Sequence, residues 1–596
     1  MLNGRLYRVA FVPFLLALAI AAFSLGARPA ALTSTLAPDA FEGKRAFAEL
    51  GTLSARYPDR RPGSRGDDAL AGYIAHTLEG LGGTAGGGFS VRTLHFEGQT
   101  IDGQRRLSTV IAQRPGSTNS SPIVILAHRD AAARGSRAEL SGTAALLELA
   151  RVFAARETKR TIILVSTSGG SGGDAGAANL AGALHGPVDA AIALGDVASA
   201  RTTRPFVVPY SDGFGSAPLQ LERTLADAIT HETTLAPGAP STIGQLAHLA
   251  FPFAAGEQGV LGARGLPAVL VQVSGEHGPS AGAPVSAERL EGFGRAVLSG
   301  VGALDTAPDA SSAPETGVVL QRKIAPAWAL QLLTATLLLG PLLIAADGLA
   351  RLRRRRAPVG RWTLWTLSCA LPFLGCAVFA YLLGALGIIA APAVPVPARS
   401  MPLNATSAIA VVLVALAFAL AWLLWGMLLR RLRWGVRPDP DVAGLPLLLV
   451  LLGVCLIAWA EDPFTALLLL PALHLWLLIA SPELRPRRLG SLALIALGFA
   501  PLALLVAFYA RQLGLGPGGV GWTAVLLVAG GHVGFGGVIL WSLALGCGVA
   551  ALMVALSPPA PLPTGGEDDP VEITIRGPLS YAGPGSLGGT ESALRR

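Results

Sequence analysis

The sequence of 596 residues has little charge and little cysteine. Asp, Glu, Lys and Arg make up 14% of the chain against 52% hydrophobic residues, and long uncharged runs lie towards its two ends. This pattern excludes an ordinary soluble enzyme and predicts an integral membrane protein with a polar insert. All the cysteines fall in apolar segments, so the insert has no disulfide and no thiolate metal site: Cys369, Cys376, Cys455 and Cys547.

The net charge of +8 does not indicate a nucleic-acid partner. The arginines cluster beside apolar runs, as in Arg351–Arg356 and Arg430–Arg431, and not along one polar face. Clusters in such places are typical of the topology signals of membrane proteins. We therefore expect the lipid bilayer as a partner and no nucleic acid.

Composition divides the chain into successive stretches. They are a cytoplasmic start at 1–8, an apolar anchor at 9–27, a polar domain at 40–310, a linker at 306–323, a transmembrane bundle at 326–556 and a disordered tail at 557–596. The stretch 9–27 has the basic start and small residues of a cleavable signal peptide as well, but ~20 apolar residues are enough to span a bilayer and favour an uncleaved anchor.

The bundle is predicted to contain about seven helices. Its apolar runs lie at 326–347, 363–389, 408–429, 443–460, 464–480, 490–509 and 537–556. The apolar but glycine-broken run 522–537 leaves three readings open: a half-span, a re-entrant loop or a further helix. The side of the membrane that holds the tail depends on this choice.

Basic residues predict the orientation of the chain. If the spans alternate, the basic segments after 347, after 429 and between 480 and 490 fall on the same side as Arg5 and Arg8. The positive-inside rule then places the polar domain outside the cytoplasm. A composition rich in Gly and Ala, with more Arg than Lys, is typical of a GC-rich bacterial genome, so we expect a multi-pass protein of a bacterial plasma membrane.

The polar domain alternates between two kinds of apolar pattern. Strand-like runs at 123–127, 161–168 and 267–273 are interleaved with helix-like runs at 66–81, 142–155 and 286–301. This alternation predicts an α/β domain with a largely buried central sheet.

Three ordered motifs in this domain resemble metallopeptidase family M28, the di-zinc exopeptidases. They are Arg61-Pro62-Gly63-Ser64 before a helix, STVIAQRPGS at 108–117, and SPIVILAHRD at 121–130 followed by a Ser-Gly that opens a helix. The resemblance implies a zinc-exopeptidase fold with a central mixed sheet flanked by helices, in addition to the all-α bundle. It also implies zinc as the cofactor and hydrolysis by a metal-activated water with a Glu as general base.

The resemblance assigns roles to four residues of this chain. His128 matches the first metal ligand, Asp196 a later carboxylate ligand and His277 the last ligand, while Asp130 matches the carboxylate that orients the histidine.

At other family positions, this chain lacks the side chains that the family pattern expects. Ala138 stands where the bridging Asp is expected, and Gly169-Gly170 stand in place of the Glu pair that supplies a ligand and the general base. His128 and Asp196 would give one zinc two ligands, and His277 would be alone at the other, whereas catalytic zinc normally has three protein ligands. We therefore expect zinc to be weakly bound or absent.

These losses predict a non-catalytic membrane protein whose peptidase-like domain serves binding or assembly, with a peptide or protein as partner. The alternative is an active zinc-dependent aminopeptidase or exopeptidase with a rebuilt site, to which Glu139, Glu257 or Glu276 would contribute. The layout is similar to multi-spanning endoplasmic-reticulum metallopeptidases and to the peptidase-like subunit of the GPI transamidase.

Two simpler interpretations concern the same motifs. A His-x-Asp after a buried strand is often only a hydrogen-bonded pair that closes the strand end. The run GGSGGDAG at 169–176 is glycine-rich like a phosphate-binding loop, but it has no Lys and no Ser/Thr at the P-loop spacing. A strand-to-helix turn is the interpretation that we favour for it.

Overall fold

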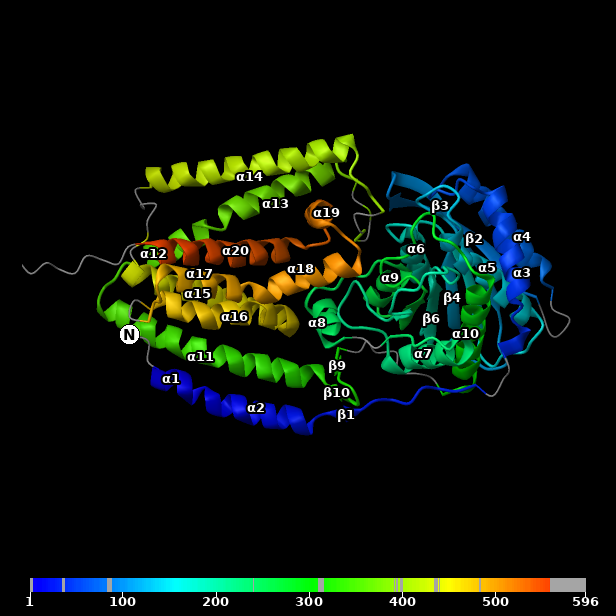
Figure 1. The fold of residues 1–596 in the computed structure, drawn as a ribbon, viewed down its shortest axis with the longest axis horizontal. Helices are drawn as coiled ribbons and strands as arrows, with labels where there is room; N and C mark the ends of the chain where they lie inside the picture. Colours follow the sequence, from blue (N-terminus) through cyan, green and yellow to red (C-terminus); the bar gives the residue numbers. More distant parts are fainter. Residues whose placement is uncertain are drawn as a thin grey trace, which may run out of the picture. The chain divides into compact units, whose positions relative to one another are not determined.

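Figure 1 presents a computed structural model of the chain. The structure describes residues 4–34, 38–82, 88–238, 241–308, 316–390, 392, 395–396, 400–432, 438, 440–481 and 484–557. Residues 309–315 of the predicted linker and 558–596 of the predicted tail lie outside the described residues.

A seven-stranded mixed sheet forms the centre of the α/β domain, in the order β2-β3-β5-β4-β6-β8-β7. Its strands are β2 Ser90–Thr100, β3 Gly103–Arg114, β4 Ile123–His128, β5 Ile162–Thr167, β6 Ala190–Leu194, β7 Val207–Val208 and β8 Ala268–Val271. Strands β5, β4, β6 and β8 run parallel, whereas β2, β3 and β7 pair antiparallel. This confirms the predicted fold class for the polar domain.

Helices cover both faces of this sheet (Figure 1). They are α3 Gly43–Arg56, α4 Arg65–Gly80, α5 Arg137–Ala154, α6 Ala175–Ala183, α7 Leu219–Thr233, α9 Glu257–Ala263 and α10 Ala287–Thr306. Helix α8 Thr242–Ala250 belongs to a separate apolar cluster with Val318 and Phe464. In β4, Ile123 and Ile125 face one apolar cluster, with α3, α5 and α10, while Val124 and Leu126 face the other, with α6 and α9. Burial on both faces explains why the strand sequence is continuously apolar.

The remaining described elements form the helical bundle and a small sheet. The bundle helices are α1 Gly4–Val9, α2 Phe11–Phe23, α11 Ala327–Arg354, α12 Val359–Ser368, α13 Leu371–Ala385, α14 Ala405–Arg431, α15 Pro440–Glu461, α16 Pro463–Ala480, α17 Arg488–Gly498, α18 Ala500–Gln512, α19 Pro517–Ala529 and α20 Phe535–Leu556. The small sheet joins β1 Gly26–Ala27, β10 Lys323–Ala325 and β9 Val318–Val319.

The described helices include seven that are long and apolar enough to cross a membrane, and eight if the pair α17 and α18, bent by 48°, counts as one span. The all-α bundle is thus confirmed and is compatible with a multi-pass membrane protein. Helix α19 has 13 residues. At 1.5 Å per residue such a helix is about 20 Å long, too short for the ~30 Å hydrocarbon core, which speaks against a further full span at 522–537.

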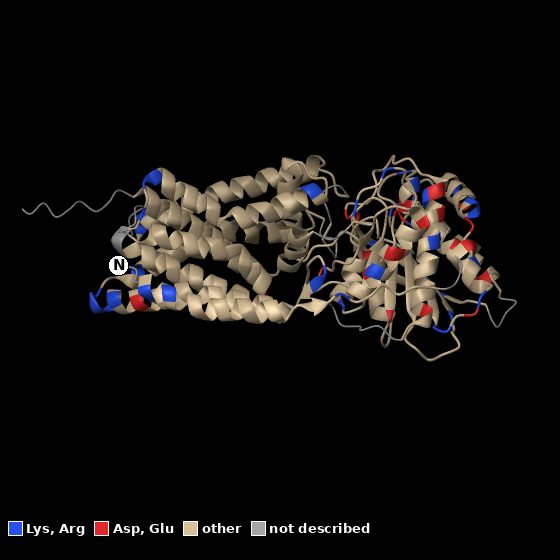
Figure 2. Cartoon of the chain, turned by 60° about the horizontal axis from the view of Figure 1, so that its bottom comes forward, with Lys and Arg blue, Asp and Glu red and all other residues tan. Residues whose placement is uncertain are grey.

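Charge is distributed unevenly along the bundle. Figure 2 shows Lys and Arg gathered at the end where the chain starts, with hardly any charge along the helices. The last turns of α11 and α14 carry arginines, and α17 begins at Arg488.

At the other end, the bundle contacts the α/β domain. Thr465 of α16 donates a hydrogen bond to the carbonyl of Ala250, and Tyr509 of α18 donates one to Phe251 O. The ring of Tyr509 also packs edge-on against the ring of His248 on α8.

Candidate functional site

A polar cavity of about 160 Å³ lies where the parallel strands end. In an open α/β sheet, ligands bind at the carboxyl ends of the strands. Its chemically active lining residues come from the ends of β4, β6 and β8, from the loop after β5 and from the starts of α5 and α9: His128, Glu139, Asp174, Asp196, Glu257, Gln272 and His277. The three residues expected as metal ligands therefore line one cavity.

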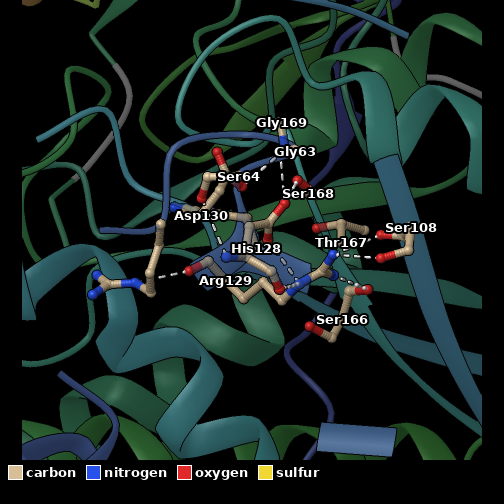
Figure 3. Close-up of polar contacts among 12 residues, drawn as sticks. Gly63, Ser64, Ser108, His128, Arg129, Asp130, Ser166, Thr167, Ser168 and Gly169 are labelled. Carbon is tan, nitrogen blue, oxygen red and sulfur yellow. Dashed lines mark hydrogen bonds and ion pairs between the residues drawn. The ribbon is translucent and has the colours of Figure 1, made fainter. Parts of the chain in front are cut away.

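Hydrogen bonds to Asp130, the last residue of the His-x-Asp motif, hold the chain in place just after β4. Asp130 accepts hydrogen bonds from the backbone N–H groups of Gly169, Gly170 and Ser171 at 2.9, 3.0 and 3.0 Å, and from Ser171 Oγ at 2.5 Å. These bonds tie the carboxylate to the loop that follows β5 (Figure 3). The role of Asp130 in orienting His128 stays a prediction.

Arg129, the middle residue of the motif, points away from the cavity and is completely buried. Its Nε lies 2.8 Å from Asp67 Oδ1, and its terminal nitrogens donate to Ser166 O and to Ser108 O and Oγ (Figure 3). Asp67 in turn accepts bonds from Gly63 N and Ser168 Oγ. Burial raises the pKa of Asp67 even though Arg129 opposes that rise. This buried pair fixes β4 against the start of α4.

Steric demands account for the glycine loop after β5. Gly169 and Gly173 have φ of +92° and +95°, a region that favours glycine. A Cβ added to Gly170 would lie 2.4 Å from the Cβ of His128, and one added to Gly176 would lie 2.6 Å from Ser168 O. The loop is a tight strand-to-helix turn that closes on His128, so a Glu side chain has no room at position 170 in this backbone.

The start of α5 is also tightly packed around position 138, where the family pattern has its bridging ligand. Ala138 is completely buried. Its carbonyl accepts a bond from Ser141 Oγ, which accepts one from Val197 N. A Cβ added to Gly142 would lie 2.3 Å from Leu194 O, so the Ser-Gly pair allows α5 to pack closely on the end of β6. The pair thus has a structural role that does not depend on a metal.

The other expected ligands have local hydrogen bonds. Asp196 accepts bonds from Ala198 N and Ser199 N at 3.1 and 2.9 Å, and burial raises its pKa. Nδ1 of His277 lies 2.6 Å from Gly278 O. Glu276 does not line the cavity, because its carboxylate lies 3.0 Å from Nε2 of His248. The suggestion that Glu276 supplies a ligand is therefore not supported.

Glu257 and Glu139 line the cavity and are the carboxylates that could replace the Asp and Glu ligands expected from the family. Glu257 Oε2 lies 3.9 Å from His128 Nδ1, while its Oε1 accepts a bond from Thr167 Oγ1. Burial raises the pKa of both glutamates.

Sequence reasoning missed a second group of buried acids beside this cavity. Asp174, at φ +41°, is the residue directly before α6, and the Oδ1 of its buried carboxyl has no hydrogen-bond partner among the described residues. Burial, reinforced by Glu257 and Asp212, raises its pKa well above the usual value. Burial also raises the pKa of Asp212 to about 7. The one signal in the sequence is an acidic residue set between glycines and alanines.

A zinc centre needs several donors placed close together. Within the described part of the chain, no three His, Cys, Asp or Glu side chains are grouped closely enough to hold a metal ion. Nδ1 of His128 and Oε2 of Glu257 lie 3.9 Å apart and supply only two ligands, whereas catalytic zinc normally has three protein ligands. What remains is a cavity lined by buried carboxyls and two histidines.

Comparisons with known proteins agree with the resemblance. The family model "Peptidase family M28" matches residues 109–242. In its α/β part, this chain is M28-like. The matched range contains His128, Ala138, Gly170 and Asp196, whereas His277 lies beyond it. A search of curated protein sequences found no match.

Similar solved structures cover somewhat less than half of this chain. An aminopeptidase from Aneurinibacillus sp. strain AM-1 is 14% identical, with 44% of this chain and 94% of that chain covered and a TM-score of 0.33. A glutaminyl cyclase from Porphyromonas gingivalis is 16% identical, with 44% and 98% covered and a TM-score of 0.31. The zinc aminopeptidase BSAP from Bacillus subtilis is 11% identical, with 44% and 95% covered and a TM-score of 0.31.

Proposed function

We propose that this chain is a multi-pass membrane protein whose M28-like domain has lost peptidase chemistry and serves binding or assembly, with a peptide or protein as its partner. The observation that carries the proposal is the closed approach of the glycine loop to His128: a Cβ at Gly170 would lie 2.4 Å from the histidine Cβ. Since the loop backbone and the buried Ala138 fill the places of three family carboxylates, the chemistry is lost in the backbone as well as in the side chains.

We further propose that the α/β domain lies outside the cytoplasm, on the plasma membrane of a bacterium. The basic ends of α11 and α14 and the basic start of α17 support this orientation, because Lys and Arg concentrate on the cytoplasmic side. If eight spans cross the membrane, the chain begins and leaves the bundle on the same, cytoplasmic side.

A second candidate function is a zinc exopeptidase with a rebuilt site. It is favoured by the unpartnered Asp174 Oδ1, because a buried carboxyl oxygen in the same cavity as His128, Asp196 and His277 would be satisfied by a cation. This candidate requires the cavity residues to move together on binding the metal.

Two experiments, a hydrolysis assay and photo-crosslinking of a partner, distinguish the two candidate functions. Purified full-length protein, supplied with zinc, is expected to hydrolyse aminoacyl and dipeptidyl reporters no faster than its His128→Ala variant. A photo-crosslinking residue at the exposed Ala281 on the cavity rim is expected to trap a peptide or protein in native membranes, while the same residue at the exposed Gly80 of α4 is not. Turnover that His128→Ala abolishes would overturn the proposal and support the rebuilt site.

A further inference from the structure

A second, larger cavity lies in the helical bundle, away from the peptidase-like chemistry. It has a volume of about 440 Å³ and lies among α13, α14, α18, α19 and α20. Its wall is apolar, with Phe373, Ala380, Val414, Phe418, Leu505 and Trp541 among the lining residues. An apolar cavity of ~150 Å³ already stays dry and binds apolar molecules, so water is a poor occupant for this one.

A helix that borders the cavity also has the exposed apolar face of a helix that contacts lipid. Helix α14 is a candidate span with only 11% of its most apolar window buried. Its large side chains Leu416, Leu420 and Leu423 are 60%, 55% and 62% exposed, as expected for a face that contacts lipid. Val414 and Phe418 of the same helix line the cavity. The cavity is therefore bounded by a helix that also faces the bilayer.

At one end, the cavity continues into the contact between the bundle and the α/β domain. Phe251 and Phe253, which follow α8, line it together with Tyr509 of α18. Tyr509 donates a 2.6 Å hydrogen bond to Phe251 O, and its ring packs edge-on against Phe253. The next residues along the chain, Ala255 to Glu257, line the polar cavity of the α/β domain. One short segment of chain thus forms part of both cavity walls.

Size and polarity narrow the choice of occupant. With about 440 Å³, the cavity is about three times the size of one that binds a small apolar molecule, which suits a longer hydrocarbon such as a fatty acyl chain. Thr523 also lines the wall, is 7% exposed, and its hydroxyl has no hydrogen-bond partner among the described residues. Since this hydroxyl is itself buried, the surface that an occupant would meet is almost entirely apolar.

We propose that this cavity holds one acyl chain of a membrane phospholipid. The chain packs against α13, α18 and α20 and supports Phe251 and Phe253. The bound lipid thereby braces the segment that carries Glu257 at the polar cavity. This inference concerns the bundle and does not rest on the function proposed for the α/β domain.

Photolabelling tests the proposal directly. The full-length protein is reconstituted into phosphatidylcholine vesicles that contain a phosphatidylcholine with a diazirine on its acyl chain, irradiated and mapped by peptide mass spectrometry. In the wild type, labelling of Phe373, Leu505 and Val528 is expected to exceed that of the outward Leu416 and Leu423 by about tenfold, the factor that corresponds to 1.4 kcal/mol of preference. Labelling that is equal on the cavity wall and the outward face would overturn the proposal.

A matched pair of variants checks the position of the chain. Ala524 is exposed and lines the cavity, so Ala524→Phe fills space with little cost to folding. Ala419 of α14 is exposed and does not line it, so Ala419→Phe adds the same side chain to the lipid-facing side. Labelling of the wall is expected to fall about tenfold in Ala524→Phe and to stay unchanged in Ala419→Phe. An equal response of both variants would contradict the proposal.

Discussion

Strands β4 and β5 are neighbours in one sheet and end at the same edge, yet their ends differ in kind. The end of β4 keeps family side chains, with His128 in the cavity and Asp130 tied to the next loop. The end of β5 keeps none of the family carboxylates and leads into a turn of glycines that closes on His128. The difference teaches that the proposed loss of the site lies in the shape of a loop, which no single substitution is expected to reverse.

The largest effect is expected where the end of β4 is anchored. Arg129→Ala leaves Asp67 buried without its partner, and breaking a buried pair in this way costs roughly 3–5 kcal/mol. His128→Ala, one residue earlier, removes a side chain whose nearest charge is 3.9 Å away and is expected to cost far less. Thermal unfolding of the full-length protein in detergent measures both. Equal losses would show that the strand end is not anchored through Arg129.

The buried acids beside the β5 turn predict a pH dependence. The pKa of Asp212 is raised to about 7, so the folded state holds this proton between about pH 4 and pH 7 while the unfolded state releases it. Stability should therefore fall as pH rises through that window, by up to roughly 4 kcal/mol from this group, and stay flat above it.

Asp212→Asn supplies the control for this pH dependence. The asparagine retains an oxygen for the bond from Ala254 N but cannot ionise. The free energy of unfolding of this variant should equal that of the wild type near pH 4 and exceed it at pH 8. If the free energies of the two proteins change in parallel from pH 4 to 8, the pKa of Asp212 is not raised.

A substitution that adds one methyl group tests how tightly the turn after β5 packs against His128. Gly170→Ala places a Cβ 2.4 Å from the histidine Cβ, and overpacking of this kind costs about 1–3 kcal/mol. Gly282→Ala, where a Cβ meets nothing within 4 Å, is the matched control and should change little. Apparent melting temperatures compare the two, and a neutral Gly170→Ala would reopen the possibility that a Glu fits there.

A smaller effect is expected for the hydrogen bonds that join the two strand ends. Ser171→Ala removes one of the four bonds to Asp130 and leaves the three from backbone N–H groups. A hydrogen bond to a charged group contributes about 1.5–3 kcal/mol, and the remaining bonds should hold the loss to the lower end. A drop in stability as large as that of Arg129→Ala would mean that the turn depends on the serine alone.

Much of the fold could be predicted from the sequence. Continuous apolar runs such as 123–127 predicted a largely buried central sheet, and the order of the motifs predicted an M28-like fold, which the sheet and the family match confirm. The family resemblance also selected His128, Asp196 and His277, and the structure places all three in the lining of one cavity. Periodicity and motif order are local properties, so a single sequence is enough to reveal them.

The details of the site could not be predicted in this way. The pairing of Arg129 with Asp67 joins residues 62 positions apart, and the charges of Asp174 and Asp212 depend on burial that only the packed structure creates. The family pattern also suggested that Asp130 serves His128, whereas its hydrogen bonds lead to the turn after β5. Spacing along the chain carries no information about these contacts.

The zinc content of the full-length protein tests the central claim most directly. Wild type and His128→Ala, purified side by side and dialysed against trace zinc, are compared by elemental mass spectrometry. The closed turn at Gly170 predicts far less than one zinc per chain in both proteins, with no difference between them. About one zinc per wild-type chain that the variant loses would contradict the account and show that the cavity residues rebuild a metal site.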